Sequence, residues 1–320
     1  MKPFEVLYPA TVNEAALLLQ ELGGDARIYA GGTELLVNLE RGLCVPKYLV
    51  SLKRIPDLNH KRIDGDFLRV GSLSTIHDIE KPQNKIEESM GIFFQAARSI
   101  GSVQIRNWGT LGGNICQEPR CIYYNHSNFW RESLKACIRR GGDPCYLLPG
   151  SKKCVAGYCS DMAPALLALD SKTAFVDSAT LREQVLGVED FLKRRMTRLI
   201  VKEMQIPIPK GPTKGIFIKY SRKKDVGFAA MSVAIVLELE ERSRRVKEAR
   251  IALGGLPDFP RHISQAEDRL KGESLDERLS EDVGRLISKE VPLFSDPFLS
   301  RDNKKAIMAT LIRRGLNSLA

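Results

Sequence analysis

The chain has 320 residues, 43% hydrophobic and 28% charged, which is the composition of a globular protein long enough for two or three domains. No apolar run approaches the ~20 residues of a membrane helix, and Pro9 and Glu14 interrupt the apolar stretch that a signal peptide needs. We therefore expect a soluble, cytoplasmic protein that does not associate with a membrane. The net charge of +10 suggests acidic partners, but the sequence has no recognition helix or RNA-binding motif, so we expect no nucleic acid.

The first part of the sequence predicts alternating helices and strands. Thr11 and Glu14 match a capping box, in which each side chain satisfies a backbone N–H at a helix start. Ser74 or Thr75 is placed to cap a later helix, with Asp78 in support. The predicted strands are residues 26–30, 48–52 and 66–73, and a further helix is predicted over 91–100.

The middle of the sequence differs from both ends. Residues 115–160 show little periodicity and predict a loop-rich segment that folds around something other than an apolar core. The proline-rich run 205–212 should be extended and is a plausible domain boundary. Regular structure is predicted as a helix from Met162, strands 232–239 and 246–253, and helices 264–270 and 302–319.

Two glycine-rich segments follow apolar stretches, Tyr29 to Leu35 and Gly109 to Asn114. Paired glycines allow backbone N–H groups to approach a phosphate without interference from Cβ atoms. Either segment alone is also compatible with an ordinary turn. Neither matches the G-x-G-x-x-G dinucleotide fingerprint, which weakens a doubly wound Rossmann interpretation.

Six of the seven cysteines fall within 44 residues, from Cys116 to Cys159. A cytosolic chain keeps its thiols reduced, so this local density favours a metal site over disulfides. The spacing lacks the close C-x2-C pairs of zinc ribbons, and four thiolates on a loop suit a 4Fe–4S cluster. The alternatives left open are a structural zinc ion and free thiols.

Five sequence blocks, taken together, resemble the FAD-binding subunits of the xanthine dehydrogenase and carbon monoxide dehydrogenase type. The blocks are A-G-G-T-E-L from Ala30, G-S-L-S-T-I from Gly71, T-L-G-G-N-I from Thr110, S-D-M-A-P-A-L from Ser160 and G-G-L-P from Gly254. The resemblance implies an α+β protein with a PCMH-type FAD-binding fold of two α/β subdomains and a smaller C-terminal α+β domain of the CO dehydrogenase flavoprotein type. We place the FAD-binding domain at residues 1–210, with subdomains at about 1–55 and 56–210, and the C-terminal domain at 215–320.

The same resemblance implies which residues bind FAD. Residues 28–35 and 110–114 would hold the diphosphate, Ile100 would line the flavin pocket, Asp161 would bind cofactor hydroxyls, and Lys219 would lie near the flavin ring. The full set is Ile28, Tyr29, Ala30, Gly31, Gly32, Thr33, Glu34, Leu35, Ile100, Thr110, Leu111, Gly112, Gly113, Asn114, Asp161 and Lys219. The alternative for Asp161 is a helix N-cap, and the alternative for Lys219 is a solubilising lysine at a strand edge.

The 46 residues between Asn114 and Asp161 are an insertion relative to typical members of that family, and we refer to residues 115–160 as the insertion. The insertion looks like that of 4-hydroxybenzoyl-CoA reductase flavoproteins, which hold FAD and an extra 4Fe–4S cluster. The match lies in Asn114 to Gln117, Arg120-Cys121, Tyr124-Asn125 and Trp130-Arg131. It implies Cys121, Cys137, Cys145 and Cys154 as cluster ligands, with Cys116 or Cys159 as an alternative for one of them.

The resemblance also implies the partners and the reaction. The expected partners are a large subunit with the molybdenum cofactor and a small subunit with 2Fe–2S clusters, in a dimer of heterotrimers, with ferredoxin as electron donor. The implied reaction is reductive dehydroxylation of 4-hydroxybenzoyl-CoA. The alternative is another molybdenum hydroxylase acting on an aldehyde, a purine, CO or another aromatic, with outward electron flow; a non-enzymatic alternative is a nucleic-acid-binding zinc protein. We identify no catalytic residue in this chain, and we expect the basic residues of the insertion, Arg139 and Arg140 among them, to face an acidic ferredoxin.

Overall fold

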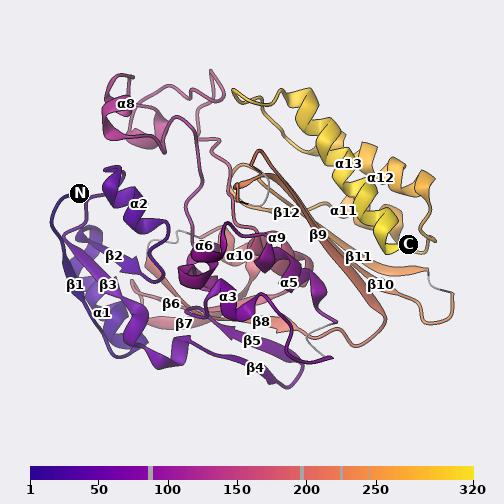
Figure 1. Ribbon diagram of the computed structural model, residues 1–320, viewed down its shortest axis with the longest axis horizontal. Coiled ribbons are helices and arrows are strands. Elements are labelled where there is room, and N and C mark those ends of the chain that lie inside the picture. The colour runs from indigo at the N-terminus through magenta and orange to yellow at the C-terminus, as the bar shows by residue number, and fades with distance from the viewer. Residues whose placement is uncertain (86–88, 195–197, 224–225, 244) are drawn as a thin grey trace.

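The computed structural model describes residues 1–85, 89–194, 198–223, 226–243 and 245–320, and Figure 1 shows their arrangement. Its strands form three sheets, of three, five and four strands. Each sheet is accompanied by its own cluster of buried apolar side chains, and helices cover the sheets. None of the helices that the model describes is long and apolar enough to cross a membrane. The mixed α+β class predicted from the sequence is confirmed.

The N-terminal sheet is parallel, in the order β1-β3-β2, and is covered by α1 (Val12–Leu22). The Thr11 hydroxyl accepts a hydrogen bond from the Glu14 N–H at 3.1 Å, as the capping-box prediction requires. The Glu14 carboxylate reaches back to the N–H of Ala10 at 2.7 Å, one residue before the expected position. The strands are β1 (Glu5–Leu7), β2 (Ala26–Tyr29) and β3 (Tyr48–Ser51).

The central sheet is antiparallel, in the order β4-β5-β8-β6-β7. Its core includes the fully buried rings of Phe93, Phe175 and Phe191. Thr75 caps α3, accepting from the Asp78 N–H at 3.1 Å. The strands are β4 (Lys61–Asp64), β5 (Phe67–Gly71), β6 (Lys172–Asp177), β7 (Arg182–Gly187) and β8 (Leu199–Pro207), and the helices are α3 (Ile76–Ile79), α5 (Gly91–Arg98), α6 (Val103–Trp108), α7 (Leu111–Ile115), α9 (Met162–Ala168) and α10 (Val188–Leu192).

The C-terminal sheet is also antiparallel, in the order β12-β11-β10-β9, and α13 lies along it (Figure 1). Gly315 allows this close approach, since a Cβ there would lie 2.8 Å from the Ile235 side chain. The strands are β9 (Thr213–Ser221), β10 (Ala229–Leu239), β11 (Val246–Gly254) and β12 (Arg261–His262), and the helices are α11 (Ser264–Leu270), α12 (Glu277–Glu290) and α13 (Arg301–Leu319).

The insertion contains one short helix, α8 (Asn128–Glu132), and a 3-10 turn at Ile138–Arg140, but is otherwise loop, as predicted. Its two ends are paired, because Arg120 and Gly157 exchange backbone hydrogen bonds at 2.7 and 3.2 Å. Gly157 also bridges to Pro257, so the G-G-L-P segment supports this neck. Figure 1 shows α8 beyond the body of the molecule, next to α2 (Leu35–Glu40).

Candidate functional site

The two glycine-rich segments meet at backbone contact. A Cβ on Gly31 would lie 2.0 Å from the carbonyl oxygen of Trp108, the residue before the second segment. Gly32 has φ of +80°, a left-handed conformation that glycine adopts without strain. Residues 30–34 and 109–114 therefore form one continuous backbone surface, which we call the cradle.

The second segment is fixed by its own side chains. The Thr110 hydroxyl accepts a hydrogen bond from the Gly113 N–H at 3.1 Å and so caps α7. Gly112 packs on Ser72, where a Cβ would lie 2.7 Å from the serine Cβ. The Asn114 amide oxygen accepts the Ser160 hydroxyl at 2.6 Å, which ties the cradle to the residue before Asp161.

A buried ion pair lies beside that tie. Lys219 Nζ on β9 is 2.6 Å from Asp161 Oδ2 and donates to the Ser99 carbonyl at 2.8 Å. The two side chains are only 10% and 6% exposed. Burial raises the pKa of Asp161 to about 6, and the Lys219 ammonium opposes that rise. Ile100, 7% exposed, follows directly on Ser99, so the pair fixes the backbone at the predicted flavin wall.

The other carboxylate oxygen, Asp161 Oδ1, is buried and has no hydrogen-bond partner among the residues described. Such an unpaired acceptor is costly, and it fits a site completed by a hydroxyl-bearing ligand. The Asp161 side chain does not cap α9, since the Ser160 hydroxyl accepts the Ala163 N–H at 3.0 Å instead. Asp161 thus stands at the N-cap position of α9 without capping it through its side chain, and the burial of Lys219 contradicts the solubilising alternative.

The remaining predicted residues form or flank the cradle, and only the Glu34 side chain points away from it. Ile28 and Tyr29 end β2, Ala30 to Glu34 form the following loop, Leu35 begins α2, and Leu111 is buried at the start of α7. The Glu34 carboxylate is engaged elsewhere, in a 3.2 Å ion pair with Arg120 of the insertion. Burial raises the pKa of Glu34, and Arg120 opposes that rise.

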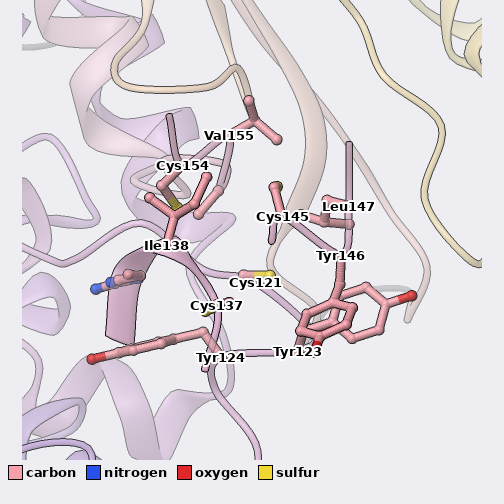
Figure 2. Close-up of a pocket in the computed structure, with 12 residues that line it drawn as sticks. Cys121, Tyr123, Tyr124, Cys137, Ile138, Cys145, Tyr146, Leu147, Cys154 and Val155 are labelled. Atoms are coloured by element: carbon pink, nitrogen blue, oxygen red, sulfur yellow. The ribbon is translucent and has the colours of Figure 1, made fainter. Parts of the chain in front are cut away.

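The four predicted cluster cysteines line a single pocket, which Figure 2 shows. Cys121, Cys137, Cys145 and Cys154 come from separate parts of the insertion, and the pocket has an empty volume of about 310 Å³, part of it open to solvent. Its other walls are mostly apolar or aromatic: Tyr123, Tyr124, Ile138, Arg139, Tyr146, Leu147, Val155 and Ala156. The sequence prediction that these four thiols come together agrees with this geometry.

The two other cysteines of the insertion lie outside this pocket lining. Burial raises the pKa of the Cys116 thiol to about 12 and that of Cys159 to about 11. Burial also raises the pKa of the Cys121 thiol, one of the predicted four. The preference for the predicted set over a replacement by Cys116 or Cys159 therefore rests on which thiols line the pocket.

Across the described residues, no three His, Cys, Asp or Glu side chains converge closely enough to hold one metal ion. A single zinc ion draws each thiolate to ~2.3 Å from one point, whereas a 4Fe–4S cluster binds each thiolate through a different iron. The zinc alternative stated from the sequence stays open beside the cluster. None of the seven cysteines, all of which lie in the described residues, forms a disulfide, and the free-thiol alternative stays open.

The basic residues of the insertion were expected to face an acidic ferredoxin, and this expectation is wrong for several of the arginines. Arg131 is 4% exposed, and the Arg139 side chain is 18% exposed, donating to the Pro119 carbonyl and pairing with Glu118. Arg120 also points inward, to Glu34. Arg140 is exposed but donates to the Arg131 carbonyl at 2.6 Å, so much of this charge stabilises the loop.

Sequence reasoning missed three participants in the site: Ser160, Arg120 and the Ser99 carbonyl. Ser160 could have been found, because it starts the S-D-M-A-P block and a serine before a helix commonly caps it. The pairing of Arg120 with Glu34 spans 86 residues and had no local signal.

Comparison with known proteins assigns both parts of the chain to described families. Residues 2–209 match the family described as the FAD binding domain in molybdopterin dehydrogenase, and residues 216–319 match the CO dehydrogenase flavoprotein C-terminal domain. A glyceraldehyde dehydrogenase medium chain of Sulfolobus acidocaldarius is 24% identical over 96% of this chain and 95% of that protein. An aldehyde oxidoreductase FAD-binding subunit of Escherichia coli is 27% identical over 84% of this chain and 86% of that protein.

Solved structures show the same fold. Quinoline 2-oxidoreductase from Pseudomonas putida 86 superposes with a TM-score of 0.76 at 22% identity, covering 98% of this chain and 96% of that one. Carbon monoxide dehydrogenase from Hydrogenophaga pseudoflava gives a TM-score of 0.79 at 22% identity, covering 99% and 96%. The chain therefore belongs to the family of FAD-binding domains in molybdopterin dehydrogenases, and it ends in a C-terminal domain of the CO dehydrogenase flavoprotein type.

Proposed function

We propose that this chain is the FAD-binding, electron-transfer subunit of a molybdenum-containing oxidoreductase. The observation that carries the proposal is the buried Asp161–Lys219 pair. Asp161 Oδ1 has no hydrogen-bond partner among the described residues, and the preceding residue, Ser160, is hydrogen-bonded to Asn114 of the cradle. FAD supplies the conversion between two-electron and one-electron chemistry, and the protein supplies its binding, orientation and electrostatics.

The cradle, Ile100, Asp161 and Lys219 each have a role in this proposal. The backbone N–H groups of residues 30–34 bind the diphosphate, and Asp161 Oδ1 accepts a hydrogen bond from a cofactor hydroxyl. The N–H groups of Leu111, Gly112, Gly113 and Asn114 already donate within the protein, so residues 110–114 would shape the cradle rather than supply those donors. Lys219 places a positive charge near the flavin, which favours an anionic reduced ring, and Ile100 forms part of its apolar wall. The substrate is converted in another subunit, which agrees with the lack of a catalytic set in this sequence.

The partners in this proposal are a large molybdenum-cofactor subunit and a small 2Fe–2S subunit. The named relatives are subunits of dehydrogenases and oxidoreductases of aldehydes, carbon monoxide, nicotinate and nicotine. Those names favour the alternative first stated from the sequence, a molybdenum hydroxylase subunit with electrons flowing outward, over a 4-hydroxybenzoyl-CoA reductase subunit.

We further propose that Cys121, Cys137, Cys145 and Cys154 bind a 4Fe–4S cluster. The support is that these four thiols, and neither Cys116 nor Cys159, line one pocket in the insertion. The cluster would add a one-electron carrier to the subunit. The four cysteine thiolates would bind its irons and take no other part in the chemistry. This second carrier is the feature that keeps reductive dehydroxylation of 4-hydroxybenzoyl-CoA, with ferredoxin as donor, as the second candidate.

The FAD proposal is tested on the purified protein. We expect about one noncovalent FAD per chain, released on denaturation and identified by chromatography. In the Asp161→Asn variant a carboxylate acceptor becomes an amide, and we expect weaker FAD binding with a retained fold. Release of no flavin, or of FMN alone, would contradict the diphosphate cradle.

The cluster proposal is tested by iron and sulfide analysis after anaerobic purification. We expect about four irons and four sulfides per chain. Cys137→Ser should lose them, whereas Cys159→Ser, which changes a cysteine outside the pocket lining, should keep them. Stoichiometric zinc without sulfide would contradict the cluster.

The two candidate reactions are separated by assaying the whole complex. Oxidation of aldehydes or N-heteroaromatics with an electron acceptor supports the hydroxylase, and reduction of 4-hydroxybenzoyl-CoA by a low-potential donor supports the reductase.

A further inference from the structure

Helix α2 runs from the FAD cradle to the insertion. It begins directly after Glu34, whose carboxylate accepts Arg120 Nη2 at 3.2 Å. Arg120 immediately precedes Cys121, and its guanidinium lies 3.9 Å from the centre of the Phe228 ring. The N-terminal end of α2 is thus joined to the backbone of a proposed cluster ligand.

The C-terminal end of α2 is joined to the same cysteine by another route. Arg41, which ends the helix, donates from Nη1 to the Asn125 carbonyl at 2.6 Å. The Asn125 side-chain oxygen accepts the Cys121 N–H at 2.8 Å, and the Asn125 N–H donates to the Cys121 carbonyl at 2.8 Å. Cys121 is therefore connected to both ends of one helix.

Arg131 adds a third connection. Its guanidinium is buried and donates to the carbonyls of Arg41 and Gly42, each at 3.0 Å, and to the His126 carbonyl at 2.5 Å. No carboxylate within the described part of the chain forms an ion pair with it. The carbonyls at a helix C-terminus carry partial negative charge, which compensates a buried cation at this position.

We infer that Arg41, Arg120 and Arg131 are positioning residues that fix the cysteine pocket on α2, so that occupation of the pocket and binding of FAD favour each other. The inference rests on the proposed FAD and cluster sites. An occupied pocket orders the segments of the insertion that carry Cys121 and Arg131, and these segments hold both ends of α2, whose first turn continues the cradle. Coupling of this kind is reciprocal, because each ligand reduces the ordering that the other requires.

The test is the dissociation constant of FAD, measured by flavin fluorescence on the deflavinated complex. It is measured once with the cluster intact and once in the Cys137→Ser complex. We expect FAD to bind about five-fold or more weakly without the cluster, at the lower end of ordinary coupling between sites. In Arg41→Ala and Arg131→Ala backgrounds the ratio of the two constants should fall toward one.

The controls use conservative and distant changes. Arg41→Lys retains a donor for the Asn125 carbonyl and should restore most of the ratio, whereas Lys152→Ala, an exposed lysine of the same insertion, should leave it unchanged. Because Arg41 is exposed, its replacement tests the inference even if Arg131→Ala does not fold. A wild-type ratio of one with iron and sulfide intact, or a ratio that the Arg41 change does not alter, would overturn the inference. A wild-type complex lacking FAD or lacking iron and sulfide would instead contradict the proposed function.

Discussion

At the scale of single residues, the Asp161–Lys219 pair determines much of the site. Both groups lie in the core between α9 and β9, and each is stable there because of the other. Removing one partner of a buried pair leaves an uncompensated charge, which is far more costly than losing a surface pair.

We predict that Lys219→Met lowers the free energy of unfolding by about 3–5 kcal/mol, since the Asp161 carboxylate would lose its cation. Chemical denaturation of the FAD-free chain measures this. Lys202→Met is the matched control: its pair with Glu183 spans 2.7 Å, but the side chains are 32% and 53% exposed, and we expect a loss of only about 0–1 kcal/mol. Equal losses in the two variants would show that Asp161 and Lys219 are not electrostatically linked.

The raised pKa of Asp161 predicts a pH dependence. Between the ordinary value of 3.8 and the folded value of about 6, the folded chain binds a proton that the unfolded chain does not, so this group makes stability fall as pH rises through that window. The amide of the Asp161→Asn variant does not titrate in this range. We therefore expect the stability of Asp161→Asn relative to wild type to increase by about 2 kcal/mol from pH 4 to pH 7 in FAD-free protein. Denaturant titrations at both pH values measure the difference, and a constant difference would contradict the shift.

At the scale of elements, the cradle depends on two loops touching through their backbones. We predict that Gly31→Ala destabilises the chain by about 1–3 kcal/mol or more and abolishes FAD binding, because its Cβ would meet the Trp108 carbonyl. Gly24→Ala is the control, since a Cβ there meets no described atom within 4 Å and its φ is not left-handed. Thermal unfolding and flavin content report the two effects. Full FAD content in Gly31→Ala would show that the loops can separate without loss of the site.

The elements that sequence predicts well are those with local signals. The caps at Thr11 and Thr75 depend on residues three positions away, and both form as predicted. The strand β7 was not predicted, because Arg182–Gly187 is largely exposed at a sheet edge and has no apolar run. The helix α12 was also missed, although Leu279, Val283 and Ile287 are buried at four-residue spacing and gave a usable signal.

The candidate site shows the same division. The glycine segments, Asp161, Lys219 and the four cysteines could be proposed from sequence blocks, and the structure brings each group together. That Lys219 would pair with Asp161 could not be derived, because the two lie 58 residues apart and meet only through the packing of β9 on the central part.

At the scale of the whole molecule, the insertion is separate from the cores. No residue from 117 to 157 belongs to any of the three buried apolar clusters. Its ends are adjacent, because Arg120 and Gly157 are paired. The insertion can therefore be removed without cutting through a core.

We predict that a chain in which residues 122–155 are replaced by a short glycine-serine linker still folds. The linker has only to join the two chain segments that are paired at Arg120 and Gly157, and the three cores are unchanged, so we expect a loss of no more than about 3 kcal/mol in the free energy of unfolding. A single cooperative denaturation transition with native-like circular dichroism would confirm this. A chain that aggregates or unfolds without a transition would show that the insertion is part of the folding unit.

The positions of the two tryptophans of the chain give an optical consequence. Trp108 is 63% exposed with its carbonyl against Gly31 of the cradle, and Trp130 stacks on His126 with ring centres 4.3 Å apart, beside Tyr123 of the cysteine pocket. The Trp108 backbone therefore lies at the cradle and the Trp130 ring lies beside the cysteine pocket, and both flavins and iron–sulfur clusters absorb light at the wavelengths that indoles emit. In Trp130→Phe the remaining emission comes from Trp108, and we expect bound FAD to quench it. In Trp108→Phe the remaining emission comes from Trp130, and we expect an occupied cysteine pocket to quench it. The loading of each site can therefore be followed separately by intrinsic fluorescence.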